Sequence, residues 1–297
     1  MGQIGRRVCG LSAAAWAAAC TLAPDVDHDG ADAPRVSNLA TRPRVAWVFS
    51  SGGPRGFVHV GVLKALDELH LKPDLIVGAS VGALVGVLYG SGQSAKAIES
   101  LALGLSPTSL ARLVVGNEGA ERFSGTPLAE LVRAQLHTHV GHHLLERLAT
   151  PVVCVAASTD GAVAAFNAGD AGLAVQAAAA IEGQFTPVRI RGRRYIDADR
   201  LCPLPVRQAQ DLGAVRVLAV DASAHEERAP DGAQRFRASD LRKRLLTQPD
   251  ADRADVLLHP EFGYWVSFTR EFRERAIEAG YRSTLAQAAR LRALHGV

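Results

Sequence analysis

The 297-residue sequence has little of three features that would each define a class of protein. Its 4 cysteines are too few for the disulfide framework of a small secreted domain. Its 33 Lys and Arg nearly balance 30 Asp and Glu, so no basic footprint indicates nucleic acid, and we expect no nucleic-acid partner. Aromatic residues make up only 5%. Small aliphatic residues dominate instead, which favours helices packed closely on a sheet.

The amino terminus has the composition of an export signal. Two arginines precede a mostly apolar run, residues 8–19, which as a helix spans about 18 Å against a hydrocarbon core of about 30 Å. We therefore expect residues 1–19 to be a signal peptide that targets the protein without anchoring it. Small residues at 17–19 directly before Cys20 resemble a bacterial lipobox, which predicts a lipidated Cys20 and a membrane-anchored protein facing the periplasm or cell exterior. The alternative is plain cleavage and secretion.

A change of pattern separates a linker from a folded domain. Residues 20–43 are rich in Ala, Asp and Pro without apolar periodicity, which predicts a flexible tether. The acidic stretch at 25–30 copies the start of a calcium loop, but Val36 stands where a bidentate Glu is needed, so we expect no metal there. From residue 44 onward, apolar runs alternate with amphipathic segments. Residues 44–297 are therefore predicted to form one three-layer α/β/α domain with a mostly parallel central sheet.

The domain opens with two strand–turn–helix units, at 45–49, 52–56 and 57–70, and then at 74–77, 78–82 and 83–89. In the second unit Ser80 stands between Gly78 and Gly82. This pattern predicts a nucleophile elbow, in which flanking glycines leave space for neighbouring backbone while the serine hydroxyl points outward. The following helix presents its N-terminus, which favours negative charge on the nucleophile or on an oxyanion. Ser80 is thus the candidate nucleophile.

The turn of the first unit is a candidate oxyanion hole. It leaves the carboxyl end of a neighbouring strand, so its backbone N–H groups can face the same point as the serine. Pro54 has no N–H, which leaves Gly52, Gly53 and Arg55 as candidate donors. A phosphate-binding loop is the alternative, but the turn has no Gly-Lys-Ser/Thr ending and no G-x-G-x-x-G follows the strand.

These motifs resemble those of patatin-like phospholipases. The matching segments are Ser51-Gly-Gly-Pro-Arg-Gly56, 59–66 and 73–82 at the start, and 184–188, 194–197 and 203–206 further on. The likeness runs from about Val45 to about Tyr281. It implies an α/β/α carboxylic ester hydrolase without a cofactor, acting as a phospholipase A or lysophospholipase on phospholipid or other acyl-ester lipids at a membrane surface.

The resemblance also implies a Ser–Asp dyad. Ser80 attacks the acyl ester, Asp197 accepts its proton without help from a histidine, and the acyl-enzyme is then hydrolysed. Two departures from the family pattern bear on this dyad. Ser51 replaces the first of three glycines, and Asp-Gly-Gly or Asp-Gly-Ala has become Asp197-Ala198-Asp199.

The second departure is the more serious. If the family glycine has a positive φ, Ala198 costs on the order of 1 kcal/mol and tilts Asp197 away from the serine. Asp199 adds a carboxylate that raises the pKa of one of the two acids if they lie close. A lipid-binding lipoprotein with weakened or lost catalysis therefore stays open as an alternative.

Histidines and basic residues suggest further alternatives. Residues 137–143 contain the H-x-H-x-x-H spacing of some two-metal hydrolases, but Gly141 stands where an acid is needed, so a polar surface turn without metal is expected. A Ser-His-Asp esterase would use His225 or His259, although the 35 residues from the first strand to Ser80 hold only one strand–helix unit. The basic segment 224–252 is a candidate for contact with anionic headgroups, with a solvated helix as the alternative.

Overall fold

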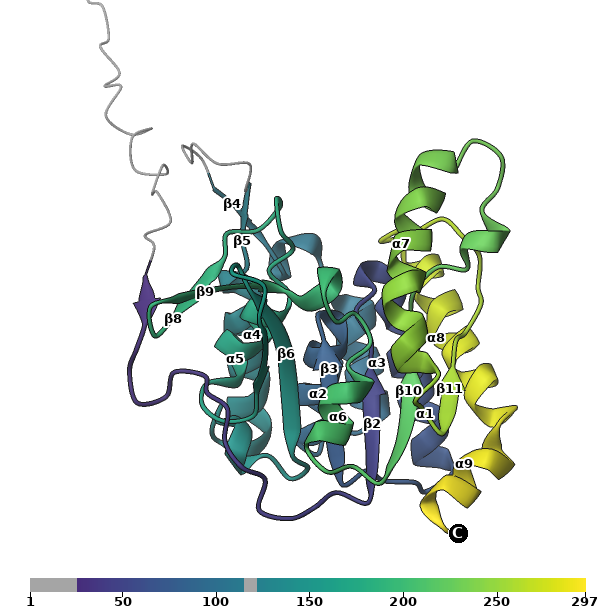
Figure 1. Ribbon diagram of the computed structural model, residues 1–297, viewed down its shortest axis with the longest axis horizontal. Coiled ribbons are helices and arrows are strands. Elements are labelled where there is room, and N and C mark those ends of the chain that lie inside the picture. Colours follow the sequence, from purple (N-terminus) through teal and green to yellow (C-terminus); the bar gives the residue numbers. More distant parts are fainter. Residues whose placement is uncertain (1–25, 115–121) are drawn as a thin grey trace, which may run out of the picture.

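The computed structural model describes residues 26–114 and 122–297. Within them, one mixed sheet runs through the molecule in the order β1-β8-β9-β6-β3-β2-β10-β11, with β7 beside β6 (Figure 1). Its strands are β1 (Asp27–His28), β2 (Val45–Phe49), β3 (Leu75–Ala79), β6 (Val152–Ser158), β7 (Val163–Phe166), β8 (Val188–Ile190), β9 (Arg193–Asp197), β10 (Arg216–Val220) and β11 (Val256–Leu258). A separate pair is formed by β4 (Arg112–Leu113) and β5 (Phe123–Ser124).

The five strands from β6 to β11 are parallel to their neighbours, whereas β7 and β9 pair antiparallel with β6. The antiparallel β8 continues from β9, and β1 lies parallel to β8. Parallel strands are covered on both faces and read as continuous apolar runs. All five residues of β2 and of β3 are buried accordingly. The predicted α/β/α fold with a mostly parallel sheet is confirmed.

Helices cover the two faces unequally. Trp47 and Phe49 of β2 belong to a large core beneath seven helices, whereas Ala46 and Val48 point to a smaller core beneath two. The seven are α1 (Phe57–Glu68), α2 (Val81–Gly90), α3 (Ala95–Gly104), α4 (Thr126–Val140), α5 (Ala171–Ala178), α8 (Arg270–Leu285) and α9 (Ala288–His295). The two are α6 (Val206–Asp211) and the end of α7 (Gln234–Ala251). In Figure 1, α6 lies in front of the sheet.

Helices α1 and α8 touch backbone to backbone. A Cβ on Gly61 would stand 1.8 Å from the carbonyl oxygen of Ile277, and one on Gly280 would stand 2.1 Å from that of Val58. Only glycine permits such an approach. The first helix of the domain is thereby locked to one from its far end.

The predicted elements agree with the observed ones to within a few residues. Strand β2 has the predicted bounds, β3 ends two residues later than expected, and α2 begins two residues earlier. Cys154 and Cys202, the two cysteines in the described ranges, are both buried and free. No helix in these ranges has the length and apolarity needed to cross a bilayer.

The described part of the predicted tether, residues 26–43, lies against the domain. Strand β1 pairs with β8, and the N–H of Arg35 donates to the carbonyl oxygen of Ala168 at 2.9 Å. The Asn167 side chain bonds both the N–H and the carbonyl of Ser37. The composition could not predict these contacts because the partners lie at least 130 residues further along the chain. The predicted signal peptide, residues 1–19, and Cys20 lie outside the described residues.

Candidate active site

Ser80 lies at a strained turn between β3 and α2. Its backbone has φ 54° and ψ −123°, a region that L-residues avoid unless the surrounding structure holds them there. A Cβ on Gly78 would stand 2.4 Å from the backbone of Gly82, and one on Gly82 would stand 2.3 Å from the carbonyl oxygen of Phe49. The elbow geometry therefore requires glycine on both sides. Ser80 is only 6% exposed, so it is more covered than the expected outward-pointing hydroxyl.

Strand register brings Asp197 beside Ser80. Ala79 of β3 is level with Val155 of β6, and Asp197 of β9 is level with the next residue of β6, Ala156. Because β6 lies between β3 and β9, Ser80 and Asp197 lie at the same level on either side of the end of β6. Asp197 is 4% exposed. Burial raises its pKa to about 7, while hydrogen bonding with Ser80 opposes the rise. The structure thus brings together a strained serine and a carboxyl group that titrates near neutral pH.

Ala198 does not carry the predicted strain. It begins a short 3-10 helix, η5 (Ala198–Arg200), that follows β9 directly. Among the described non-glycine residues, only His70, Ser80 and Arg191 have a positive φ. The expected tilt of Asp197 therefore has no backbone cause at Ala198, whose small side chain is fully buried.

The two departures from the family motifs contact each other. The Ser51 hydroxyl donates to the Asp199 carboxylate, and the Lys243 ammonium lies 2.7 Å from the same carboxylate oxygen. Against burial, Lys243 and Ser51 hold the pKa of Asp199 below its usual value. The N–H of Asp199 in turn donates to the Asp197 carboxylate at 2.9 Å. The Asp199 carboxylate, bound by Ser51 and Lys243, therefore lies next to Asp197, the candidate base.

Lys243 is a site residue that the sequence analysis missed. It was assigned with its basic neighbours to a segment facing headgroups or water, yet it reaches from α7 to Asp199, 44 residues away in the chain. No local pattern distinguishes it from the arginines around it. Only the tertiary fold, which packs the end of α7 against the sheet, reveals the contact.

The predicted oxyanion turn forms a short 3-10 helix, η2 (Gly53–Gly56). The Arg55 N–H donates within it to the Gly52 carbonyl oxygen at 3.1 Å, so this N–H is used within the turn, and Gly52 and Gly53 remain candidate donors. The buried Arg55 guanidinium donates to backbone carbonyls, including that of Gly263 at 2.8 Å, and faces the ring of Phe262. No carbonyl or side chain in the described ranges accepts the N–H of Gly52 or Gly53.

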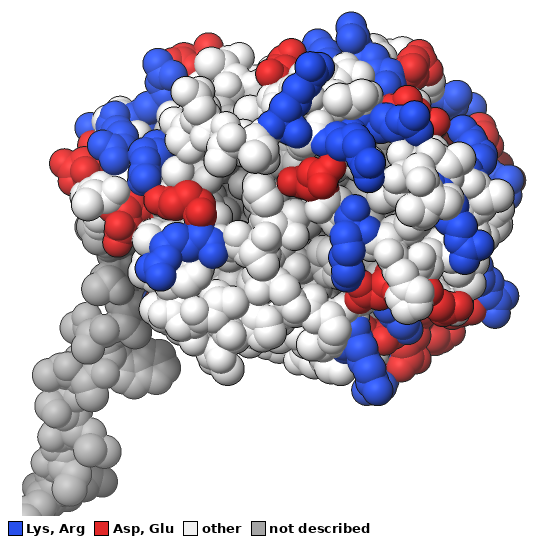
Figure 2. Space-filling model, turned by 90° about the horizontal axis from the view of Figure 1, so that it is seen from below, with Lys and Arg blue, Asp and Glu red and all other residues white. Residues whose placement is uncertain are grey.

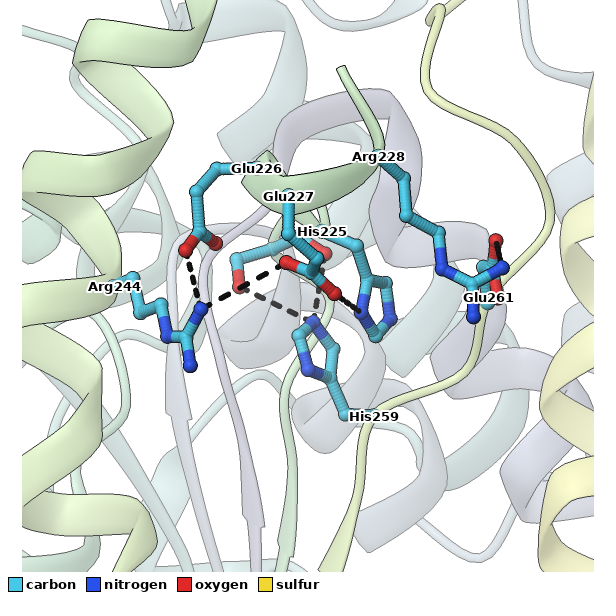
Figure 3. A network of polar contacts seen from close by, with 8 residues as sticks. His225, Glu226, Glu227, Arg228, Arg244, His259 and Glu261 are labelled. Atoms are coloured by element: carbon cyan, nitrogen blue, oxygen red, sulfur yellow. Dashed lines mark hydrogen bonds and ion pairs between the residues drawn. The ribbon is translucent and has the colours of Figure 1, made fainter.

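His225 and His259 form a separate cluster (Figure 3). Their rings stack with centroids 3.7 Å apart, and His259 bonds the carbonyl oxygen of Ser223. His225 follows β10, two strands from the serine strand, and His259 follows β11, three strands away. In the described ranges the ring nitrogens of His225 and His259 bond Glu227 and Ser223, and neither bonds Ser80, which bonds Asp197 instead. These contacts do not support the Ser-His-Asp alternative.

The histidines at 137–143 lie at and just beyond the end of α4. His137 and His139 belong to the last turn of α4 rather than to a loop, and the ring nitrogens of His137 and His143 lie 3.0 Å apart. Within the ranges that the structure describes, no three His, Cys, Asp or Glu side chains are placed to hold a metal ion.

Comparison with known proteins shows the family of the chain. The family of patatin-like phospholipases matches residues 47–209, more than half of the chain, so the chain belongs to that family of lipid acyl hydrolases. An uncharacterised NTE-family protein of Mycobacterium tuberculosis is 32% identical over 190 residues, which cover 63% of this chain and 51% of the relative. The human patatin-like phospholipase domain-containing protein 6 is 28% identical over 66% of this chain and 14% of its own length.

Among solved structures, VipD from Legionella pneumophila superimposes with a TM-score of 0.56 over 89% of this chain and 70% of VipD. At 14% identity, this likeness shows the fold alone. The chain spans about half the length of the mycobacterial relative. The activity of those longer proteins is therefore only proposed for this chain.

Proposed function

We propose that this protein is a serine carboxylic ester hydrolase of the phospholipase A or lysophospholipase type, acting on membrane lipids through a dyad of Ser80 and Asp197. The observation that carries the proposal is the meeting of the elbow serine with a buried carboxyl group whose pKa is raised to about 7. A general base works best when its pKa lies near the working pH. An Asp with an ordinary pKa near 3.9 would be a weak base.

In the proposed reaction the Ser80 oxygen attacks the ester carbonyl carbon as its proton passes to the Asp197 carboxylate. The N–H groups of Gly52 and Gly53, together with the N-terminus of α2, stabilise the oxyanion of the tetrahedral intermediate. Protonated Asp197 then returns the proton to the leaving alcohol or lysolipid. Water, activated by the same carboxylate, hydrolyses the acyl-enzyme and releases a fatty acid.

Lys243 and Asp199 set the charge around the base. Asp199 raises the pKa of Asp197 as a neighbouring negative charge, and Lys243 lowers it. Because Lys243 pairs with Asp199, the negative charge that Asp199 places near Asp197 is compensated by a positive charge. This pairing supports an active enzyme over a lipid-binding protein that has lost catalysis.

The test is the Ser80→Ala variant, assayed on a soluble aryl ester and on lysophosphatidylcholine. We expect kcat to fall by about 10³-fold or more, and a fluorophosphonate to label only the parent protein. Equal turnover by Ser80→Ala would overturn the dyad. A protein that binds lipid, turns over neither ester and takes no label would be the non-catalytic alternative.

We also propose that the chain is exported by residues 1–19 and anchored through a lipid on Cys20. The support is the sequence alone, in which small residues precede Cys20. Radioactive palmitate should label the parent protein in a bacterial host and should not label Cys20→Ser. Release of both proteins into the soluble fraction without label would contradict the anchor.

A further inference from the structure

Helix α7 leaves most of its surface without a protein partner. From Gln234 to Leu246 its residues are exposed or half-buried, and tight packing begins only at Thr247. Figure 1 shows its upper half standing above the carboxyl ends of the parallel strands, the end of the sheet that carries the site. A helix whose upper turns are this exposed can contact something outside the fold.

The projecting half of α7 is apolar on more than one side. At 100° per residue, Leu241 and Leu245 lie together on the side opposite Lys243, the residue that faces the site. Leu245 is 67% exposed. Phe236 lies on the inner side and packs edge-on against Trp265 in the segment between β11 and α8. Apolar residues on opposite sides of a projecting helix are suited to insertion into lipid, which surrounds the helix, because a protein partner would cover only one side.

The neighbouring segment extends this apolar area. Trp265 is 53% exposed and Phe268 is 54% exposed, with Val266 between them in the chain. Exposed aromatic side chains in soluble proteins are few, and Trp is enriched where apolar and aqueous phases meet. The contact of Trp265 with Phe236 holds this segment against the N-terminal turns of α7.

Positive charge without carboxylate partners accompanies the apolar area, and the Arg235 guanidinium lies over the ring of Phe236. No carboxylate in the described ranges lies within 4.0 Å of Arg235, Arg237 or Arg242, whereas Arg244 is paired with Glu226 (Figure 3). The opposite end of the molecule differs: Figure 2, seen from below, shows Lys and Arg interleaved with Asp and Glu around an uncharged centre. Apolar side chains flanked by unpaired arginines are complementary to a bilayer of anionic lipids.

We propose that the α7 surface docks on anionic lipid bilayers. This surface consists of Arg235, Phe236, Arg237, Leu241, Arg242 and Leu245, with Trp265, Val266 and Phe268. Its apolar side chains enter the headgroup region and its arginines bind phosphate groups from above. Because Lys243 joins α7 to Asp199, docking places the site next to the lipid, and only this consequence rests on the proposed function.

The experiment uses the full chain with Cys20→Ser, which removes any lipid anchor, and with Ser80→Ala, which prevents hydrolysis of the vesicles. Co-sedimentation is measured with phosphatidylcholine vesicles and with vesicles containing about one third phosphatidylglycerol. We expect binding to the anionic vesicles and much weaker binding to the neutral ones. Arg237→Gln and Arg242→Gln should each weaken anionic binding about fivefold, and Trp265→Ser with Phe268→Ser should weaken it about tenfold or more.

Matched controls lie at the opposite end of the sheet. Val215 is similarly exposed directly before β10, and Arg253 is an exposed arginine beyond the packed end of α7. Val215→Ser and Arg253→Gln should bind like the parent. Fluorescence of the parent minus that of Trp265→Phe should shift to the blue only with anionic vesicles, which reports insertion at this surface.

Equal binding by the α7 variants and the controls would overturn the proposal. So would loss of concentration-dependent self-association in these variants without any effect on vesicles, which would make a second copy the occupant. Each variant in a Ser80-containing protein should still hydrolyse the soluble aryl ester at the parent rate. If docking fails while aryl ester hydrolysis is unchanged, the docking proposal is wrong and the proposed dyad is unaffected. If hydrolysis does not depend on Ser80 but docking is observed, the dyad is wrong and the docking surface is unaffected.

Discussion

The two halves of the candidate dyad are held in place by different physical means. Ser80 is positioned by backbone packing, because Gly78 and Gly82 approach main-chain atoms so closely that no side chain fits. Asp197 is positioned by strand pairing at the end of β9 and tuned by side chains, chiefly Asp199 and Lys243. A steric clash at these glycines displaces the backbone outright, whereas a change of nearby charge shifts the pKa of Asp197 by a graded amount. The nucleophile half should therefore fail abruptly on substitution, and the base half should respond gradually and with pH.

The largest combined effect on turnover and stability should come from adding a single methyl group at the elbow. In Gly82→Ala the new Cβ would meet the Phe49 carbonyl oxygen at 2.3 Å, and backbone of β2 cannot move without disturbing the sheet. We expect ester turnover to fall by about 10³-fold and the melting temperature to fall as well. Gly104→Ala, at the end of α3, meets no atom within 4 Å and serves as the control. Turnover of Gly82→Ala within tenfold of the parent would show that the elbow tolerates displacement.

The base half should lose activity without losing the fold. Asp197→Asn keeps the shape and the hydrogen bond from the Asp199 N–H but cannot accept a proton. We expect kcat on the aryl ester to fall by about 10²- to 10⁴-fold, with an unchanged or raised melting temperature because a buried carboxylate is removed. A variant that retains most of its turnover would assign the base to another group.

The sequence predicted the elbow around Ser80 but not the side chains that surround Asp197. The elbow is encoded by adjacent residues, since strand, glycine, serine, glycine and helix follow one another within about 15 positions. The surroundings of Asp197 depend on Ser51 and Lys243, which come from other elements. The same reason explains residues 26–43, whose partners lie on β8 and near Asn167. The sequence also does not show that the Arg55 N–H bonds within its own turn, to the carbonyl oxygen of Gly52.

The pH profile sharpens the comparison. Asp197 must be ionised to accept a proton, and burial raises its pKa to about 7. The kcat/KM of the parent should therefore fall as pH drops through about 7 and level off above it. This limb should be absent from the small residual activity of Asp197→Asn. A parent profile that stays flat down to pH 5 would contradict a base with a raised pKa.

Lys243 provides a graded change to the same limb. Removing its positive charge in Lys243→Met leaves Asp199 unpaired beside Asp197, which raises the pKa of Asp197 further. The acid limb should move to higher pH, and kcat/KM at pH 7 should fall by about three- to tenfold. Lys243→Arg should restore most of the parent profile. In Lys243→Met combined with Asp199→Asn the limb should return toward lower pH, a rescue that a merely structural role for Lys243 would not produce.

The smallest effect should come from restoring the family residue at position 198. Ala198 has no positive φ and its side chain is fully buried, so Ala198→Gly relieves no strain and removes a packed methyl group. We expect the free energy of unfolding to fall by about 1 kcal/mol while kcat/KM stays within about twofold of the parent at every pH. Chemical denaturation and the pH profile measure the two quantities separately. A gain in activity would show that the alanine does displace Asp197, and the base half would then share the backbone control that governs Ser80.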